Sequence, residues 1–422
     1  MNSKTIPDSG SSLPVNGSFY DRPNVKKELI PVAGGIPFGA EKVFNSKLGV
    51  GGVYGTWGAS YDNNSLSQLI ENMLEQPLPD EERMNLADLG FTSRHHIPKL
   101  NPSDHLQLEL EVGSRMLTAA MQSNGWQPSE IAGVLLGVSG PVADDYVNRI
   151  CNLAGIPDSA IKVSVHKACD GSMGALQLSL NTSKETGNKI NIARELYGKK
   201  ILVGGIEGLS RFVSQTHDKN ALQLFANGAG VIGVIPGESF KFLVGKEFEA
   251  YDEDGALAVR MFYPHSRNRQ PGQSMIEVSN EKNVGIRVAG LMHEPEDGDP
   301  IAMAGLMGMV KLFVRNGVQV VADVYEAYQK LMAKNNTPHE IAVAIAHHAN
   351  FKINGLKHKQ LQKLGIDLNM PWLLSDFGNV CAASNIIAFL RQLPLLNPGD
   401  HVLFDGFGAG TYYDVLAVEM GG

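Results

Sequence analysis

The chain has 422 residues, of which 43% are hydrophobic and 19% charged, a composition typical of a soluble globular protein with one large or two to three smaller domains. The formal net charge of −8 excludes a generally basic surface for nucleic acid or anionic lipid, although a local basic patch could still bind an acidic carrier protein. The three cysteines are too few for a disulfide framework and indicate a reducing, cytoplasmic location. No run of eighteen apolar residues is present, so we expect no membrane span.

The chain begins with an extension, residues 1–46, that is rich in Ser, Gly, Pro and Asn. It lacks the basic head and the apolar core of a secretory signal, and its acidic residues argue against a transit peptide. We expect this extension to be partly disordered and partly draped over a core that begins near Lys47.

An apolar strand ends near Val165, and small residues then lead into an amphipathic helix pattern with Cys169 at the junction. At the start of a helix, unpaired backbone N–H groups and the helix dipole stabilise a thiolate, which is the reactive form of cysteine. Cys169 is therefore a candidate nucleophile, although a buried structural role is the commoner one for a single cysteine.

An internal repeat follows from several short matches in the same order. Glu130 and Glu340 stand in similar contexts 210 positions apart (340 − 130), and the same shift carries Cys169 to Asn379. Matching strands occur at 201–205 and 402–406, and each is followed by a Gly-Ala-Gly sequence and a further strand. We infer a duplicated α/β unit, with halves 47–236 and 237–422, whose central strands are covered by helices on both faces.

Two further segments lie in the second half. The polar stretch Pro264–Asn283 has the residues of turns and indicates a long surface loop, and the helical pattern Met303–Met332 follows it.

The duplication predicts that equivalent strand ends meet, so that Cys169, His347 and Asn379 share one pocket. A thiolate can attack an acyl carbonyl and carry the acyl group. Imidazole and amide N–H groups can then stabilise the enolate that forms when a second thioester loses CO₂. The backbone N–H groups of Cys169 and Ala409 are candidates for the oxyanion hole of the acyl-transfer step.

Four motifs between about Lys47 and the C-terminus carry a family resemblance. They are Ala168-Cys169 at the start of a helix, His347-His348-Ala349-Asn350, Gly378-Asn379-Val380-Cys381-Ala382-Ala383-Ser384 and Phe407-Gly408-Ala409-Gly410. As a set, and together with residues 225–230, they resemble the ketoacyl-acyl-carrier-protein synthase III family of the thiolase superfamily.

This resemblance implies an α/β fold of five layers, αβαβα, with two pseudo-symmetric halves, and a homodimer. It implies that Cys169 is the acyl nucleophile and that His347 and Asn379 form the decarboxylation pair, with no metal or other cofactor. Acyl carrier protein or acyl-CoA thioesters would be the substrates. The candidate substrate-binding residues are Arg94, which matches a basic position of the family, and the motif residues Asn350, Phe407, Gly408 and Gly410.

Some positions depart from the family pattern. The family's CoA-binding tryptophan and arginine would fall near Met84 and Asp88, which favours a carrier-borne acyl donor. Lys167 could lower the pKa of Cys169 or could be held in an ion pair. Asp144 and Asp145 could cap the following helix, or one of them could act as the base of a condensation without decarboxylation.

Several other residues have simpler interpretations. We expect Cys151 and Cys381 to be core-packing thiols, and His348 to pack or hydrogen-bond. The adjacent histidine pairs lack the spacing of a zinc site, and Gly228-Ala229-Gly230 precedes a strand, which disfavours a phosphate loop.

The function predicted is a decarboxylative condensation that gives a β-ketoacyl product. Two alternatives remain open: a specialised-metabolite ketosynthase or cyclase that joins two β-ketoacyl thioesters, and a non-catalytic partner subunit of a heteromeric synthase.

Overall fold

The structure, a computed structural model, describes residues 25–31, 36–97, 100–139, 145–184, 191–210, 223–250, 259–261, 276–278, 305–337, 339–409 and 412–421. Four predictions of the sequence analysis lie wholly or mostly outside these ranges: the first part of the N-terminal extension, the surface loop Pro264–Asn283, and the roles of Asp144 and Gly410.

Two β-sheets form the centre of the molecule. In spatial order, the seven strands of the larger sheet are β1 (Val25–Pro31), β2 (Pro37–Asn45), β3 (Val50–Trp57), β9 (Gly228–Val234), β8 (Ile201–Glu207), β6 (Gly133–Gly137) and β7 (Ile161–Val165). The four strands of the smaller sheet are β10 (Phe240–Glu249), β15 (Tyr412–Met420), β14 (His401–Gly408) and β13 (Ile341–Ala346).

The two sheets repeat one topology. In the larger sheet, β3 pairs with β9 and β9 with β8 in antiparallel fashion, and β8 pairs with β6 in parallel. In the smaller sheet, β10, β15, β14 and β13 follow the same order with the same directions. The predicted pseudo-symmetric halves are therefore confirmed as a feature of the fold. The boundary between the two halves at residue 236 remains a prediction. Strand β2 lies within the predicted N-terminal extension, and it pairs along its length with β3 of the core.

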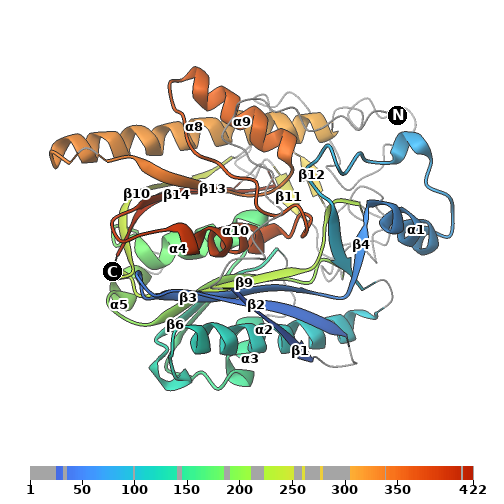
Figure 1. Cartoon of the computed structure of the whole chain (residues 1–422), viewed down its shortest axis with the longest axis horizontal. Helices are drawn as coiled ribbons and strands as arrows, with labels where there is room; N and C mark the ends of the chain where they lie inside the picture. The colour runs from blue at the N-terminus through green and yellow to red at the C-terminus, as the bar shows by residue number, and fades with distance from the viewer. Residues whose placement is uncertain are drawn as a thin grey trace.

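Helices separate and cover the sheets in five layers (Figure 1). The two central helices, α4 (Gly171–Leu180) and α10 (Ser384–Gln392), lie between the sheets. They are buried on nearly every side, as expected for helices with few charged residues. The outer faces carry α2 (Pro102–Ser123) and α3 (Tyr146–Leu153) on the larger sheet, and α8 (Gly305–Lys334) and α9 (Phe351–Lys363) on the smaller one. The predicted αβαβα architecture is confirmed.

Three large apolar clusters fill the spaces between these layers. One includes Met116 and Val134 under the larger sheet, a second includes Leu176 and Ile387 between the sheets, and a third includes Leu403 under α8 and α9. Because the central cluster holds both central helices rigidly, residues at the start of these helices are well fixed.

Shorter elements complete the described part. They are β4 (Ala59–Asp62), α1 (Asn63–Leu74), β5 (Ser93–His96), α5 (Ile192–Leu196), β11 (Val259–Met261), β12 (Ile276–Val278) and the 3₁₀ turns η3 (Asp80–Glu82), η4 (Pro128–Glu130), η5 (Ala168–Asp170), η7 (Cys381–Ala383) and η8 (Leu393–Leu395). Among the helices within the described ranges, none is long and apolar enough to cross a lipid bilayer.

Candidate active site

Cys169 lies in the turn η5, which joins β7 to the buried helix α4. The preceding residue, Ala168, has a φ of 50°, a backbone conformation that residues other than glycine rarely adopt. Such backbone strain persists only where the surrounding structure holds it in place, and strained residues of this kind cluster at functional sites. The Cys169 side chain is half-buried, and the turn presents it at the N-terminal end of a helix as predicted.

Cys381 lies in an equivalent turn of the second half. The turn η7 precedes α10 as η5 precedes α4, and Cys381 has a φ of 42°. The two turns begin 213 positions apart (381 − 168). The counterpart of Cys169 is therefore Ala382, whereas the shift of 210 had predicted Asn379.

The sulfurs of Cys169 and Cys381 lie 3.2 Å apart. Cys381 is buried in the core as predicted, and its sulfur also contacts that of Cys169, which the sequence did not indicate.

The pKa values of the two thiols are shifted in opposite directions. The hydrogen bond with the Cys381 thiol lowers the pKa of Cys169 to about 5, in opposition to burial, and His347 lowers it further. Burial and the neighbouring Cys169 sulfur raise the pKa of Cys381 well above its usual range. Both shifts favour the proton on Cys381 and the negative charge on Cys169, and a thiolate is the reactive form of cysteine.

His347 follows directly after β13, and its imidazole hydrogen-bonds with Cys169. The backbone N–H of His347 donates to the carbonyl of Asp405 (2.9 Å), and its own carbonyl accepts from the side chain of Asn354 (3.1 Å). The Phe407 ring packs edge-on against the imidazole, with 5.0 Å between ring centroids. Hydrogen bonds thus hold the backbone of His347, and the Phe407 ring holds its imidazole.

Asn379 is held so that its amide N–H₂ remains available. Its Oδ1 accepts a hydrogen bond from the backbone N–H of Cys381 (3.0 Å). Its backbone pairs with the segment 224–226 through the carbonyl of Leu224 (3.1 Å) and the N–H of Ala226 (3.0 Å). Within the described part of the chain, Nδ2 donates to no other group, so its N–H donors can be offered to a substrate. The structure thus brings Cys169, His347 and Asn379 together around Cys381.

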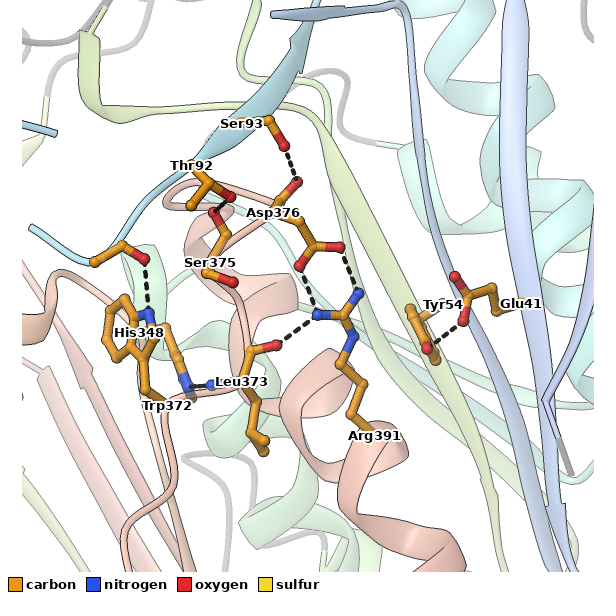
Figure 2. A network of polar contacts seen from close by, with 11 residues as sticks. Glu41, Tyr54, Thr92, Ser93, His348, Trp372, Leu373, Ser375, Asp376 and Arg391 are labelled. Carbon is orange, nitrogen blue, oxygen red and sulfur yellow. Dashed lines mark hydrogen bonds and ion pairs between the residues drawn. The ribbon is translucent and has the colours of Figure 1, made fainter. Parts of the chain in front are cut away.

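A buried clamp fixes the segment that leads to Asn379 (Figure 2). The Arg391 guanidinium binds both carboxylate oxygens of Asp376 (2.6 and 2.8 Å) and donates to the carbonyl of Leu373 (2.5 Å). The same guanidinium lies 4.7 Å from the ring centroid of Phe377 and 5.3 Å from that of Tyr54 in β3. The clamp therefore connects this segment to the larger sheet.

Two further contacts hold the same segment. The N–H of Thr92 donates to the carbonyl of Ser375 (2.6 Å). His348 accepts from the N–H of Leu373 through its Nε2 (2.9 Å) and packs against Trp372, with 4.6 Å between ring centroids. The prediction that His348 packs and hydrogen-bonds is confirmed, and Figure 2 shows both groups of contacts around one loop.

The predicted glycine motif lies beside the nucleophile turn. Gly408 ends β14, and a Cβ at this position would lie 2.3 Å from the carbonyl oxygen of Lys167, so only glycine fits here. Ala409 follows with a φ of 52°. Phe407 is completely buried and contacts His347, which makes it a packing residue of the imidazole and not an exposed substrate contact.

Buried charges lie next to the turn that carries Cys169. Lys167 forms ion pairs with Asp414 (2.7 Å) and Glu247, and the carboxylates of Asp414, Asp170 and Glu247 raise the pKa of Lys167 despite its burial. The ion-pair alternative for Lys167 is therefore confirmed. Asp170 is buried beside Asp414, and both burial and this second carboxyl raise the pKa of Asp170 well above its usual range.

Two predicted site residues, Arg94 and Asn350, have structural roles. Arg94 is completely buried, binds the carbonyl of Gln223 and the side chain of Asn63, and packs beside Gly378, so it supports the Asn379 segment and does not face a ligand. The Asn350 side chain caps α9 through the N–H of Ile353 (2.9 Å).

Asp145 is exposed at the start of α3 and makes no side-chain cap bond there.

Glu207, at the end of β8, was missed by the sequence analysis. Its Oε1 accepts from the N–H and hydroxyl of Ser139 (3.0 and 2.6 Å) and from the N–H of Ala382 (3.2 Å). A buried carboxylate thus ties the larger sheet to the turn that carries Cys381. Its position at the carboxyl end of a central strand is the signal that could have identified it.

Comparisons with known proteins agree with this architecture. Residues 331–420 match the family profile described as 3-oxoacyl-[acyl-carrier-protein] synthase III C terminal. The β-ketoacyl-[acyl-carrier-protein] synthase III of Gloeobacter violaceus is 24% identical over 315 residues, which cover 74% of this chain and 83% of that protein.

Solved structures share the fold. The 3-oxoacyl-(acyl carrier protein) synthase III of Pseudomonas aeruginosa PAO1 superposes with a TM-score of 0.56 at 18% identity, over 86% of this chain and 95% of that one. The tetronic acid condensing enzyme AbyA1 superposes with a TM-score of 0.53 at 14% identity, over 86% and 96% of the two chains.

Proposed function

We propose that this chain is a ketoacyl synthase III-like condensing enzyme of the thiolase superfamily, an acyltransferase, and that it joins an acyl group on Cys169 to a malonyl-type thioester with loss of CO₂. The observation that supports this most is the convergence on Cys381 of the Cys169 sulfur (3.2 Å) and the Asn379 side chain (3.0 Å), with the His347 imidazole on Cys169. These groups suffice for both half-reactions.

In the first half-reaction, the Cys169 thiolate attacks the carbonyl carbon of an acyl thioester. A new C–S bond forms to Cys169, the C–S bond to the donor breaks, and the donor leaves as a thiol after taking up a proton. The backbone N–H groups of Cys169 and Ala409 would stabilise the oxyanion, since Gly408 holds the 407–409 segment against the nucleophile turn.

In the second half-reaction, a malonyl-type thioester loses its carboxylate as CO₂. The enolate oxygen accepts hydrogen bonds from the His347 imidazole and from Nδ2 of Asn379, which is the free donor of that side chain. The enolate carbon then attacks the acyl carbonyl. A C–C bond forms, the C–S bond to Cys169 breaks, and the β-ketoacyl thioester and the thiolate are released.

The acyl groups would arrive on a carrier protein. The positions that bind CoA in the family hold Met84, whose N–H is bonded to the Gln223 side chain (2.7 Å), and Asp88, which pairs with Lys352 (3.3 Å). Neither side chain can stack on an adenine or bind a phosphate as tryptophan and arginine do. We also expect a homodimer located in the cytoplasm.

The test uses the acylated full-length protein and a labelled malonyl group on a carrier protein. We expect one equivalent of CO₂ and one β-ketoacyl product per Cys169 adduct. A β-ketoacyl co-substrate that condenses without release of CO₂ would favour the alternative, a ketosynthase that joins two β-ketoacyl units. A chain that forms no acyl adduct at all would contradict both and indicate a non-catalytic partner.

A further inference from the structure

The contact between the two thiols is close enough for them to bond. The sulfurs of Cys169 and Cys381 lie 3.2 Å apart, and disulfide sulfurs lie about 2.05 Å apart, so an approach of roughly 1 Å would close the bond. Each thiol lies in a 3₁₀ turn that leads into a central helix, and the Asn379 side chain holds the Cys381 N–H at 3.0 Å. The pairing is therefore built into the fold of both halves.

The two sulfurs differ in exposure. Cys169 is half-buried, whereas Cys381 is only 2% exposed. A small oxidant that enters the site therefore meets the Cys169 thiolate first, and thiolates are the form that peroxides oxidise. Cys381 is shielded from solvent but touches the sulfur that would be oxidised, which is the arrangement of a resolving thiol.

We propose that Cys169 and Cys381 form a redox modification site, in which a peroxide converts the nucleophile to a reversible disulfide with Cys381. The Cys169 thiolate attacks the peroxide, an S–O bond forms, the O–O bond breaks, and hydroxide leaves. The Cys381 sulfur then attacks the resulting sulfenic acid; an S–S bond forms, the S–O bond breaks, and the hydroxide takes the thiol proton. In total, two thiols are oxidised and hydrogen peroxide is reduced to two waters.

The local charges favour the second step once the first has occurred. Burial, the negative Cys169 sulfur and Glu207 all raise the pKa of the Cys381 thiol. A sulfenic acid at Cys169 is neutral at neutral pH, so its formation removes one of these influences and makes the Cys381 thiol easier to ionise. The disulfide diverts Cys169 from sulfinic acid, which thiol reductants do not reverse.

Oxidation would abolish acylation only if Cys169 is the acyl nucleophile, so this consequence of the disulfide rests on the proposed function. Formation of the disulfide does not rest on it. The experiment therefore measures the bond in the protein itself, apart from any acyl transfer.

The reduced full-length protein is treated with hydrogen peroxide, alkylated with N-ethylmaleimide, and analysed by intact mass and peptide mapping. We expect the wild type to lose the mass of two hydrogen atoms, to yield a linked Cys169–Cys381 peptide, and to regain full alkylation of Cys169 after dithiothreitol. In Cys381→Ser we expect no linked peptide and sulfinic acid at Cys169 that dithiothreitol does not reverse. Cys381→Ala should likewise give no linked peptide, which covers a folding defect of either variant, but it should form sulfinic acid more slowly at neutral pH because its Cys169 thiol is less ionised.

Cys151→Ser is the matched control. Cys151 is completely buried in the cluster under the larger sheet, and burial raises its pKa to about 11, so it should neither oxidise readily nor affect the linked peptide. Over-oxidation of wild-type Cys169 without a linked peptide would overturn the proposal. A disulfide between two copies of the chain would also overturn it, as would dithiothreitol recovery of Cys381→Ser equal to that of the wild type.

Discussion

The side-chain oxygen of Asn379 accepts a hydrogen bond from the backbone N–H of Cys381 at 3.0 Å. This bond fixes the turn that places the Cys381 thiol against Cys169, and in the proposed function the N–H₂ group of the same amide is a donor to the substrate oxygen. If the proposed function holds, this contact links the groups of the acyl-transfer step to those of the decarboxylation step.

The first prediction concerns the thiol pair. Cys381→Ala removes the hydrogen bond that contributes most to the low pKa of Cys169, so this pKa should rise from about 5 toward the ordinary cysteine value of roughly 8.5. The rate of iodoacetamide alkylation measured against pH should show its midpoint move upward. Cys381→Ser, which retains a donor, should restore part of the shift, and Cys151→Ser should show none. An unmoved midpoint in Cys381→Ala would contradict the assignment.

The second prediction separates the two half-reactions. Asn379→Ala and His347→Ala each remove a donor to the enolate oxygen, so release of CO₂ from a malonyl thioester should fall by about 10²–10³-fold. Acylation of Cys169 should survive in both variants when it is measured near pH 9, because the thiol is then ionised even without help from His347. The exposed Asn369→Ala is the control. Undiminished release of CO₂ in both variants would exclude the proposed pair.

A third prediction concerns the buried ion pair of Lys357 and Asp405 (2.6 Å), both of which are fully enclosed. Lys357→Met leaves an unpaired carboxyl beneath His347, and we expect a loss of about 3–5 kcal/mol in the free energy of unfolding. Lys352→Met, on the same helix, breaks only an exposed pair with Asp88 and should change stability little. Urea denaturation of the two variants measures the difference. Similar midpoints for both would contradict the importance of this pair.

The fourth prediction tests the clamp on the Asn379 segment. Arg391→Lys keeps the charge but cannot bind both oxygens of Asp376 and the carbonyl of Leu373 in the same planar geometry. A shift of Asn379 by about 1 Å could cost up to roughly 10²-fold in CO₂ release, with acylation of Cys169 much less affected. Arg194→Lys on the exposed face of α5 is the control. Equal losses in acylation and in CO₂ release would argue against a positioning role.

The sequence was sufficient for the features that follow from local pattern. A strand that breaks on small residues before a helix located Cys169, a histidine at the end of an apolar strand located His347, and repeated motifs predicted two sheets of equal topology. In each case the chemistry depends on where a strand or a helix ends, and residue type and periodicity indicate that position.

Features that depend on contacts between distant segments could not be predicted in this way. The offset of 210 taken from short motifs missed the structural offset of 213, so the contact of Cys381 with Cys169 was not predicted, although its burial in the core was. Arg94 was assigned to a ligand because it matches a basic position of the family, whereas the carbonyl of Gln223 and the side chain of Asn63 bind it in the interior. Burial and partners of this kind arise only when the two halves pack together.

The most direct test of the account is the mass of the reduced protein after exposure to a panel of acyl-carrier and acyl-CoA thioesters. We predict one acyl adduct per chain, mapped to the Cys169 peptide, absent in Cys169→Ser and discharged when a malonyl thioester is added. A chain that remains unmodified by every donor, or a Cys169→Ser variant that is acylated as fully as the wild type, would contradict the assignment of Cys169 as the nucleophile.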